Sequence, residues 1–185
     1  MKKSFFILFL IPLMLSCSHN DKKTGTGKKD VPDTKKEAMN VAIDYAKGKF
    51  KESKETVAAN GVVTVTDSQI NYIMNNNIQL KYVIDPARIV AGQIDDDTIE
   101  DAIITISLFN GQYIEMPESL ILINTDGKLV LNRSIESDMK IMGIKDRVIT
   151  AEIFTHSRNS PLRNCSACKE VVKYKYKMGD LVRIE

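Results

Sequence analysis

From residue 79 onward, apolar residues recur with a period close to two, and short turn sequences separate the apolar runs. A period of two is typical of strands, because successive side chains point to opposite faces of a sheet. Strands joined by short turns pair antiparallel, and the runs do not follow the alternation of strand and helix that a parallel sheet requires. The predicted strands are 80–84, 88–91, 102–108, 120–124, 129–132, 148–154, 171–176 and 181–184.

Two hairpin turns and one alternating strand stand out in this region. Segments 125–127 (Thr-Asp-Gly) and 178–180 (Met-Gly-Asp) lie between predicted strands and contain the glycine that hairpin turns favour. Residues 173–177 alternate Lys and Tyr, which predicts a half-buried strand with tyrosines on one face and lysines on the other. The alternative for these tyrosines is a stacking platform for nucleic acid or glycan.

One helix is expected before the strands. Thr34 and Glu37 have the spacing of a capping box. Apolar residues between 38 and 46 then recur every three to four positions, and Lys47 with Gly48 is typical of a helix end. This helix is expected to pack its apolar stripe against the sheet.

Residues 49–78 are ambiguous between helix and strand. Segment 62–66 is rich in β-branched residues, whereas 66–68 (Thr-Asp-Ser) could cap a short helix that runs to Met74. The three asparagines at 75–77 end whichever element precedes them. The predicted fold class is α+β, mainly an antiparallel β-sheet or sandwich with one N-terminal helix.

Charge is unevenly distributed along the chain. The 185 residues carry 26 basic and 24 acidic side chains, but residues 1–36 contain eight of the lysines and only three aspartates. Residues 37–185 therefore hold 18 basic and 21 acidic side chains, a net charge of −3. An acidic balance argues against a nucleic-acid partner.

The first seventeen residues have the order of a secretory signal. Lys2 and Lys3 precede an apolar segment at 5–15, and Ser16 and Cys17 follow it. The apolar segment is too short to span a bilayer as a helix, so a cleaved leader at 1–16 is expected. A short N-terminal membrane anchor is the alternative.

The end of this leader, Met14-Leu15-Ser16-Cys17, resembles the lipobox of bacterial lipoproteins. In that family a small residue precedes the cysteine that is lipidated and becomes the new N-terminus, and Bacteroides-group lipoproteins often have loosened boxes of this kind. The resemblance implies that Cys17 carries acyl chains such as palmitate and that the membrane is a partner through this N-terminal lipid. It also implies a place in the bacterial cell envelope, at the outer membrane. Ordinary secretion with Cys17 as a free thiol is the competing interpretation.

The segment after the leader predicts a flexible tether. Residues 17–36 are polar, rich in Lys, Gly and Thr, and contain no apolar run that could form a core. The expected organisation is a signal peptide at 1–16, the lipidated cysteine and tether at 17–36, and a single β-rich domain at 37–185.

The densest group of carboxylates lies at 95–101, directly before the apolar segment 102–106. The stretch resembles the acidic loop of FG-GAP and integrin-type β-repeats. That resemblance implies a calcium site with Asp95, Asp97 and Asp101 as ligands, because calcium takes several hard oxygen ligands from one short loop.

Two positions in this loop depart from the family pattern. Gln93 stands where the pattern has an aspartate, and Thr98 stands where it has a glycine. The first change removes a charged ligand and the second disfavours a turn with positive φ. We therefore favour an acidic turn held by bonds from aspartates to the backbone, with weak calcium binding as the alternative and no other cofactor.

Cys165 and Cys168 form a C-x-x-C pair, which suits a disulfide, a redox motif or half of a zinc site. A zinc site needs further ligands, and the remaining histidines are His19 and His156. In an oxidising envelope a local disulfide is favoured, with a reduced pair as the alternative.

The sequence favours a protein that is not an enzyme. Ser157 follows His156, but adjacency in sequence does not produce the geometry of a catalytic triad. The chain also lacks the G-x-S-x-G, H-E-x-x-H and phosphate-binding glycine motifs.

Two functions from different classes remain open. The first is a lipid-anchored envelope protein with a binding or structural role, whose partner is an unidentified envelope protein or glycan. The second is a secreted inhibitor or solute-binding module that uses loop 156–168, since loops on a rigid sheet often carry recognition.

Overall fold

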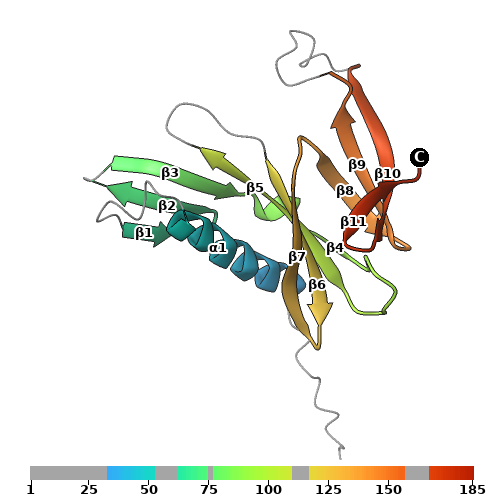
Figure 1. Cartoon of the computed structure of the whole chain (residues 1–185), viewed down its shortest axis with the longest axis horizontal. Helices are drawn as coiled ribbons and strands as arrows, with labels where there is room; N and C mark the ends of the chain where they lie inside the picture. Colours follow the sequence, from blue (N-terminus) through green and yellow to red (C-terminus); the bar gives the residue numbers. More distant parts are fainter. Residues whose placement is uncertain (1–32, 53–61, 75–76, 110–116, 157–166) are drawn as a thin grey trace, which may run out of the picture. The chain divides into compact units, whose positions relative to one another are not determined.

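A computed structural model of the chain describes residues 33–52, 62–74, 77–109, 117–156 and 167–185. Pro32–Glu185 form one compact unit. Within the described residues there are one α-helix, one short 3₁₀-helix and eleven strands in two antiparallel sheets (Figure 1). The predicted α+β class, mainly antiparallel with an N-terminal helix, is confirmed.

The larger sheet, sheet A, has the strand order β1-β2-β3-β5-β6-β7, and β4 also pairs with β5. The smaller sheet, sheet B, has the order β11-β10-β9-β8. The strands of sheet A are β1 Val62–Val65, β2 Gln69–Met74, β3 Asn77–Ile84, β4 Val90–Gly92, β5 Asp101–Phe109, β6 Glu118–Thr125 and β7 Lys128–Glu136. The strands of sheet B are β8 Lys140–Lys145, β9 Val148–Phe154, β10 Lys169–Lys177 and β11 Asp180–Arg183.

Helix α1 (Thr34–Glu52) begins as expected but ends later than its sequence predicts. It continues through Gly48 because Phe50 is buried against the rings of Tyr72 and Tyr82, so tertiary contacts outweigh the weak helix propensity of glycine. Among the described residues, no helix is both long and apolar enough to cross a membrane.

The capping of α1 also differs from the predicted capping box. Asp33 supplies the cap, because its Oδ1 accepts hydrogen bonds from the backbone N–H groups of Lys35 and Lys36 at 3.1 and 3.3 Å. Glu37 does not close a box. Its carboxylate instead accepts from the backbone N–H of Leu129 in β7 at 2.9 Å and so joins the helix to sheet A.

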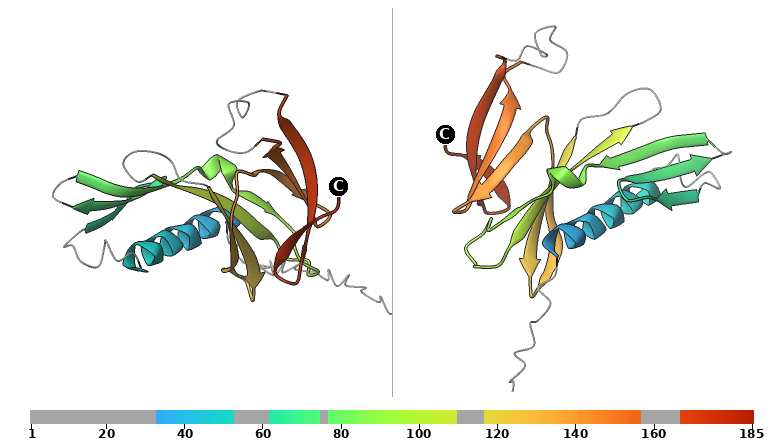
Figure 2. Two further views of the ribbon diagram at one scale, coloured as in Figure 1. Left: turned by 45° about the horizontal axis from the view of Figure 1, so that its top comes forward. Right: turned by 180° about the vertical axis from the view of Figure 1, so that it is seen from behind.

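Strands β5 and β6 are buried on both faces, which explains their continuous apolar runs. One face of sheet A packs against α1, and the other packs against sheet B (Figure 2). To the α1 side these two strands contribute Ala102, Ile104, Ile106, Leu120 and Leu122, and to the sheet B side they contribute Ile103 and Ile121.

Three further elements differ from the sequence-based expectation. The prediction of a short helix up to Met74 is wrong, because residues 69–74 form strand β2. This strand pairs with β1 and β3 and buries Ile70 and Tyr72 beneath α1. The strand predicted at 88–91 begins only at Val90, because Arg88 belongs to the 3₁₀-helix Pro86–Arg88. Strand β8 was not predicted, since its Met-Gly pair interrupts the alternation and coincides with a bulge.

Three two-residue turns among the described residues have positive φ at both central positions, the type I′ geometry. Asp126-Gly127 joins β6 to β7, and Met178-Gly179 joins β10 to β11. These are the two hairpins that the sequence predicts. Asp146-Arg147 joins β8 to β9 with φ of 52° and 61°. The sequence did not reveal this third turn because it contains no glycine.

Candidate functional site

The acidic loop connects β4 to β5 and is organised around Asp101. Asp101 has no exposed surface, and one carboxylate oxygen accepts from the backbone N–H of Ile94 at 2.7 Å and of Asp95 at 3.4 Å. The other oxygen accepts from the backbone N–H of Asn124 in β6 at 2.9 Å. Asp101, the first residue of β5, is therefore hydrogen-bonded both to the start of the loop and to the neighbouring strand β6.

The outer part of the loop consists of two successive turns made by aspartates. Asp95 Oδ1 accepts from the backbone N–H of Asp97 at 3.0 Å, and Asp97 Oδ1 accepts from that of Ile99 at 2.7 Å. Gln93 donates from Nε2 to the carbonyl oxygen of Thr98 at 3.1 Å, which closes the loop. The structure thus contains the aspartate-to-backbone bonds that the sequence analysis favours.

The three predicted calcium ligands are near one another in sequence, but their carboxylates accept hydrogen bonds from different backbone groups. Asp101 is buried under backbone N–H groups, whereas Asp95 and Asp97 each hold a turn. In the part of the chain that the structure describes, no group of three or more His, Cys, Asp or Glu side chains is arranged to hold a metal ion. Weak calcium binding stays a prediction, which thermal melts with and without millimolar calcium would test.

Burial raises the pKa of Asp95 above its ordinary value of 3.8. The negative charges of Asp101 and Asp97 act in the same direction, while the N–H of Asp97 lowers the pKa. Three carboxylates in one short loop therefore repel one another, and this loop attracts positive charge.

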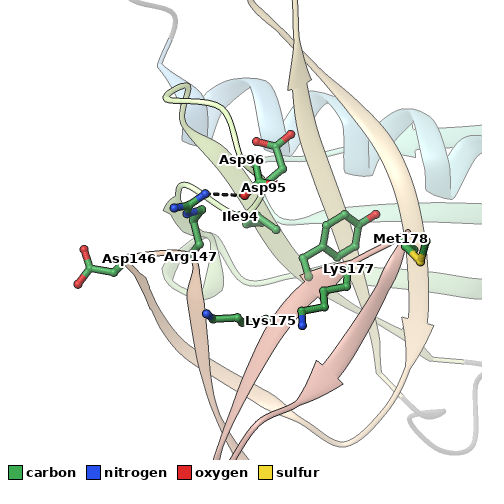
Figure 3. A pocket seen from close by; sticks show the side chains of 9 residues that line it. Ile94, Asp95, Asp96, Asp146, Arg147, Lys175, Lys177 and Met178 are labelled. Atoms are coloured by element: carbon green, nitrogen blue, oxygen red, sulfur yellow. Dashed lines mark hydrogen bonds and ion pairs between the residues drawn. The ribbon is translucent and has the colours of Figure 1, made fainter.

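An open pocket of about 660 Å³ lies beside this loop, between it, the β8–β9 turn and the β10–β11 turn (Figure 3). Its lining residues come from the acidic loop, from the β8–β9 turn and from the end of β10 with the following turn. They are Ile94, Asp95, Asp96, Asp146, Arg147, Lys175, Tyr176, Lys177 and Met178. The pocket therefore has both acidic and basic side chains on its wall, with Ile94, Tyr176 and Met178 as apolar contributors.

Arg147 connects the two sheets at this pocket. Its guanidinium forms an ion pair with the carboxylate of Asp96, so the β8–β9 turn of sheet B reaches the loop of sheet A (Figure 3). The Asp96 side chain is fully exposed, so the pair itself adds little stability. The effect of the pair is to hold the guanidinium of Arg147 next to the carboxylates of the acidic loop.

The structure bears on the other predicted sites only in part. Cys168 is disulfide-bonded, but Cys165 lies outside the described residues, and so do Cys17 and most of loop 156–168. Pairing of Cys168 with Cys165 and lipidation of Cys17 stay predictions. His156 is half-buried at the end of the described segment 117–156.

The alternation in β10 is confirmed. Tyr174 and Tyr176 pack against the core between the two sheets, whereas Lys175 and Lys177 are exposed. The tyrosines therefore belong to the core and do not present an outer stacking platform.

Sequence reasoning missed Arg147 and Met178 as pocket residues. Nothing in the sequence marks Arg147, because its turn lacks glycine and its partner Asp96 is 51 residues away. The predicted hairpin at Met178 could have indicated an exposed apolar tip, and that side chain is fully exposed.

No protein-family model, curated protein or solved structure was found to match this chain.

Proposed function

We propose that this chain is a lipid-anchored protein of a bacterial cell envelope, held at the outer membrane, and that its domain is a binding module and not an enzyme. The observation that carries the proposal is the order of positive charge, apolar segment, Ser16 and Cys17. Acyl chains on Cys17 supply stable anchoring when more than one chain is present.

The geometry of the domain supports a binding role. A three-layer scaffold of α1, sheet A and sheet B positions the loop before β5 and two hairpin turns around one open pocket. The buried carboxylate at the end of the acidic loop, Asp101, accepts hydrogen bonds from backbone N–H groups, so it acts in the scaffold. Loops supported in this way are a common means of recognising a partner.

Anchoring is tested by Cys17→Ser, with Ser18→Ala as the matched control at the adjacent position. The cysteine variant is expected to move from the membrane fraction to the soluble fraction, and the control is expected to stay with the membrane. Mass spectrometry of the wild type should find an acylated N-terminal Cys17. An unmodified mature N-terminus at another residue would contradict the proposal.

Binding is tested by affinity capture from envelope extracts with the mature chain. A specific partner of the pocket should be retained by wild type and by Lys51→Gln on α1. The partner should be lost with Arg147→Gln, which removes the cation that faces Asp96. Equal capture by all three proteins would place the partner elsewhere.

A further inference from the structure

The face of sheet B that points away from sheet A carries a group of lysines from β10. Lys169, Lys173, Lys175 and Lys177 all occupy odd-numbered positions of β10 and so share one face of the strand, with Val171 between the first two. The opposite face carries Val172, Tyr174 and Tyr176, which pack into the core between the sheets. The four lysines therefore form a row on the outer face.

The acidic groups that contact this lysine row are already paired. Glu152 accepts from Lys169 at 2.8 Å, and Glu185 forms an ion pair with Lys173. No ion pair is found for Lys175 or Lys177 among the described residues. Lys175 and Lys177 thus carry positive charge that no ion pair in the described part of the chain neutralises, although Asp95, Asp96 and Asp146 line the pocket beside them and Asp180, the strand partner of Lys177, is paired with Arg133.

Exposed aliphatic side chains lie among these lysines. Val171 in β10 is 59% exposed, and Val182 in β11, which pairs with Lys175, is 43% exposed. A lysine combines a charged end with an apolar stem, so it can contact charged headgroups and still lie along apolar surface. The outer face therefore combines cations with small apolar contacts.

These features favour an anionic lipid surface over a polyanionic chain. Recognition of sugars or bases uses aromatic stacking, but both β10 tyrosines point inward, and Lys169 Nζ lies over the ring of its strand partner Phe154, 5.3 Å from the centroid. Bidentate recognition of individual phosphates uses arginine, whereas this row consists of lysine, which acts as a compact point charge.

The tether makes such a contact reachable. Sixteen residues separate Cys17 from the start of α1 at Thr34, and a chain of that length spans at most about 55 Å. The proposed anchor would therefore keep the domain within that distance of a bilayer, where charge would select the face that meets the lipid.

We propose that the outer face of sheet B docks on an anionic lipid bilayer through its lysine row. In the cell this docking rests on the proposed anchoring, because the tether concentrates the domain at the membrane. The interaction itself belongs to the domain and does not require the acyl chains.

The test uses the chain from residue 17 on with Cys17→Ser, so that no lipid is attached. Co-sedimentation is measured with phosphatidylcholine vesicles and with mixed phosphatidylcholine–phosphatidylglycerol vesicles. Binding is expected only to the mixed vesicles. It should weaken as salt rises from about 0.1 to 1 M, because the Debye length falls from about 10 to about 3 Å.

Lys175→Gln combined with Lys177→Gln is expected to reduce the partition coefficient about 25-fold, since each lysine near an anionic surface contributes about fivefold. The matched control is Lys36→Gln with Lys51→Gln, two exposed lysines of α1 on the far side of sheet A. Because Lys175 and Lys177 also line the pocket, Lys173→Gln tests a lysine of the row that lies outside the pocket lining, and it is expected to weaken binding as well. The α1 control should bind as the parent does.

Equal loss in the α1 pair, unchanged binding of Lys173→Gln, or no binding to mixed vesicles would overturn the docking proposal. Stronger binding to a soluble anionic polysaccharide than to vesicles would overturn it in favour of a glycan partner. Each of these results is independent of whether Cys17 is acylated, so the docking and the anchoring can fail separately.

Discussion

The Asp101 carboxylate lies at the first position of β5 with no exposed surface, and it accepts from three backbone N–H groups. Hydrogen bonds to a charged acceptor contribute more than neutral ones, and a buried N–H that loses its acceptor is costly. The arrangement explains why an aspartate stands at the boundary between an exposed loop and the most buried strand.

We expect Asp101→Asn to lower the free energy of unfolding by about 2–3 kcal/mol, because an amide can offer only one oxygen to donors on two sides. Asp97→Asn is the matched control, since its amide oxygen can keep the single bond to Ile99, and it should cost less than about 0.5 kcal/mol. Urea unfolding of both variants measures the difference. Similar midpoints would show that Asp101 does not organise the loop.

Tyr45 on α1 makes the stability sensitive to alkaline pH. Burial raises its pKa above the ordinary value of 10.0, and its hydrogen bond to Glu118 acts in the same direction. The hydrogen bond with Tyr45 in turn raises the pKa of Lys49 above 10.5. Both groups keep their protons in the folded state after the unfolded chain has begun to lose them. Their contribution is therefore complete below the unfolded pKa values and is lost as pH rises through the folded ones.

Tyr45→Phe should thus be less stable than wild type at neutral pH by about 1 kcal/mol, the net value of one hydrogen bond. The difference should shrink as pH rises from about 9 to about 11, because only wild type loses the contribution of the phenol. Urea midpoints across this pH range measure the stability difference between the two proteins. Glu118→Gln should show a smaller pH-dependent difference of the same kind. A constant difference at every pH would contradict this account.

At the scale of elements, the junction between the two sheets depends on a glycine. Strand β4 of sheet A lies against β8 of sheet B, and a Cβ built on Gly92 would lie 2.8 Å from the Cβ of Ile144. The absence of a side chain at Gly92 therefore permits the close approach of the two strands.

Gly92→Ala is expected to destabilise the protein by about 1–3 kcal/mol, as overpacking of a well-packed core does. Gly143→Ala is the matched control, because nothing lies within 4 Å of a Cβ at that glycine in β8 itself. Thermal or urea unfolding compares the two. Equal stability of both variants would mean that β4 and β8 can separate without cost.

At the scale of the whole molecule, β5 and β6 couple the two hydrophobic clusters. Ile104 belongs to the cluster beneath α1, and the adjacent Ile103 belongs to the cluster beneath sheet B. Because neighbouring residues of one strand contribute to both clusters, we expect the two layers to unfold together.

Ile103→Ala and Ile104→Ala are each expected to cost about 2–5 kcal/mol. Both should lower the stability of α1 and of β9–β10 together, since the unit should unfold cooperatively. Peptide-resolved hydrogen exchange in increasing urea measures the two regions separately. Protection that is lost in only one layer for either variant would show that the layers unfold independently.

Elements were predicted accurately where their own residues carry the pattern, and inaccurately where contacts with distant residues decide the structure. Strands β5, β6 and β9 were predicted closely because long apolar or alternating runs report burial directly. The end of α1 and the identity of β2 were missed because distant partners decide them, namely the aromatic contacts of Phe50 and the pairing of β2 with β1 and β3.

The site shows the same division. Its acidic loop is evident from sequence, since carboxylates gather at 95–101 and each aspartate can bond to backbone groups nearby. The pocket is not evident, because Arg147 and Lys177 come from turns and strand ends that only the folded sheets bring next to the loop.

The sequence by itself determined the features that depend on neighbouring residues: antiparallel strands, glycine-containing hairpins, the acidic turns and the alternation of Lys and Tyr in β10. These follow from backbone sterics and from side-chain period, which act over a few residues. The tertiary structure decided the division into two sheets, the burial of Asp101 and the pairing of Arg147 with Asp96. Those features depend on which apolar faces cover one another, and that choice is made only when the whole chain packs.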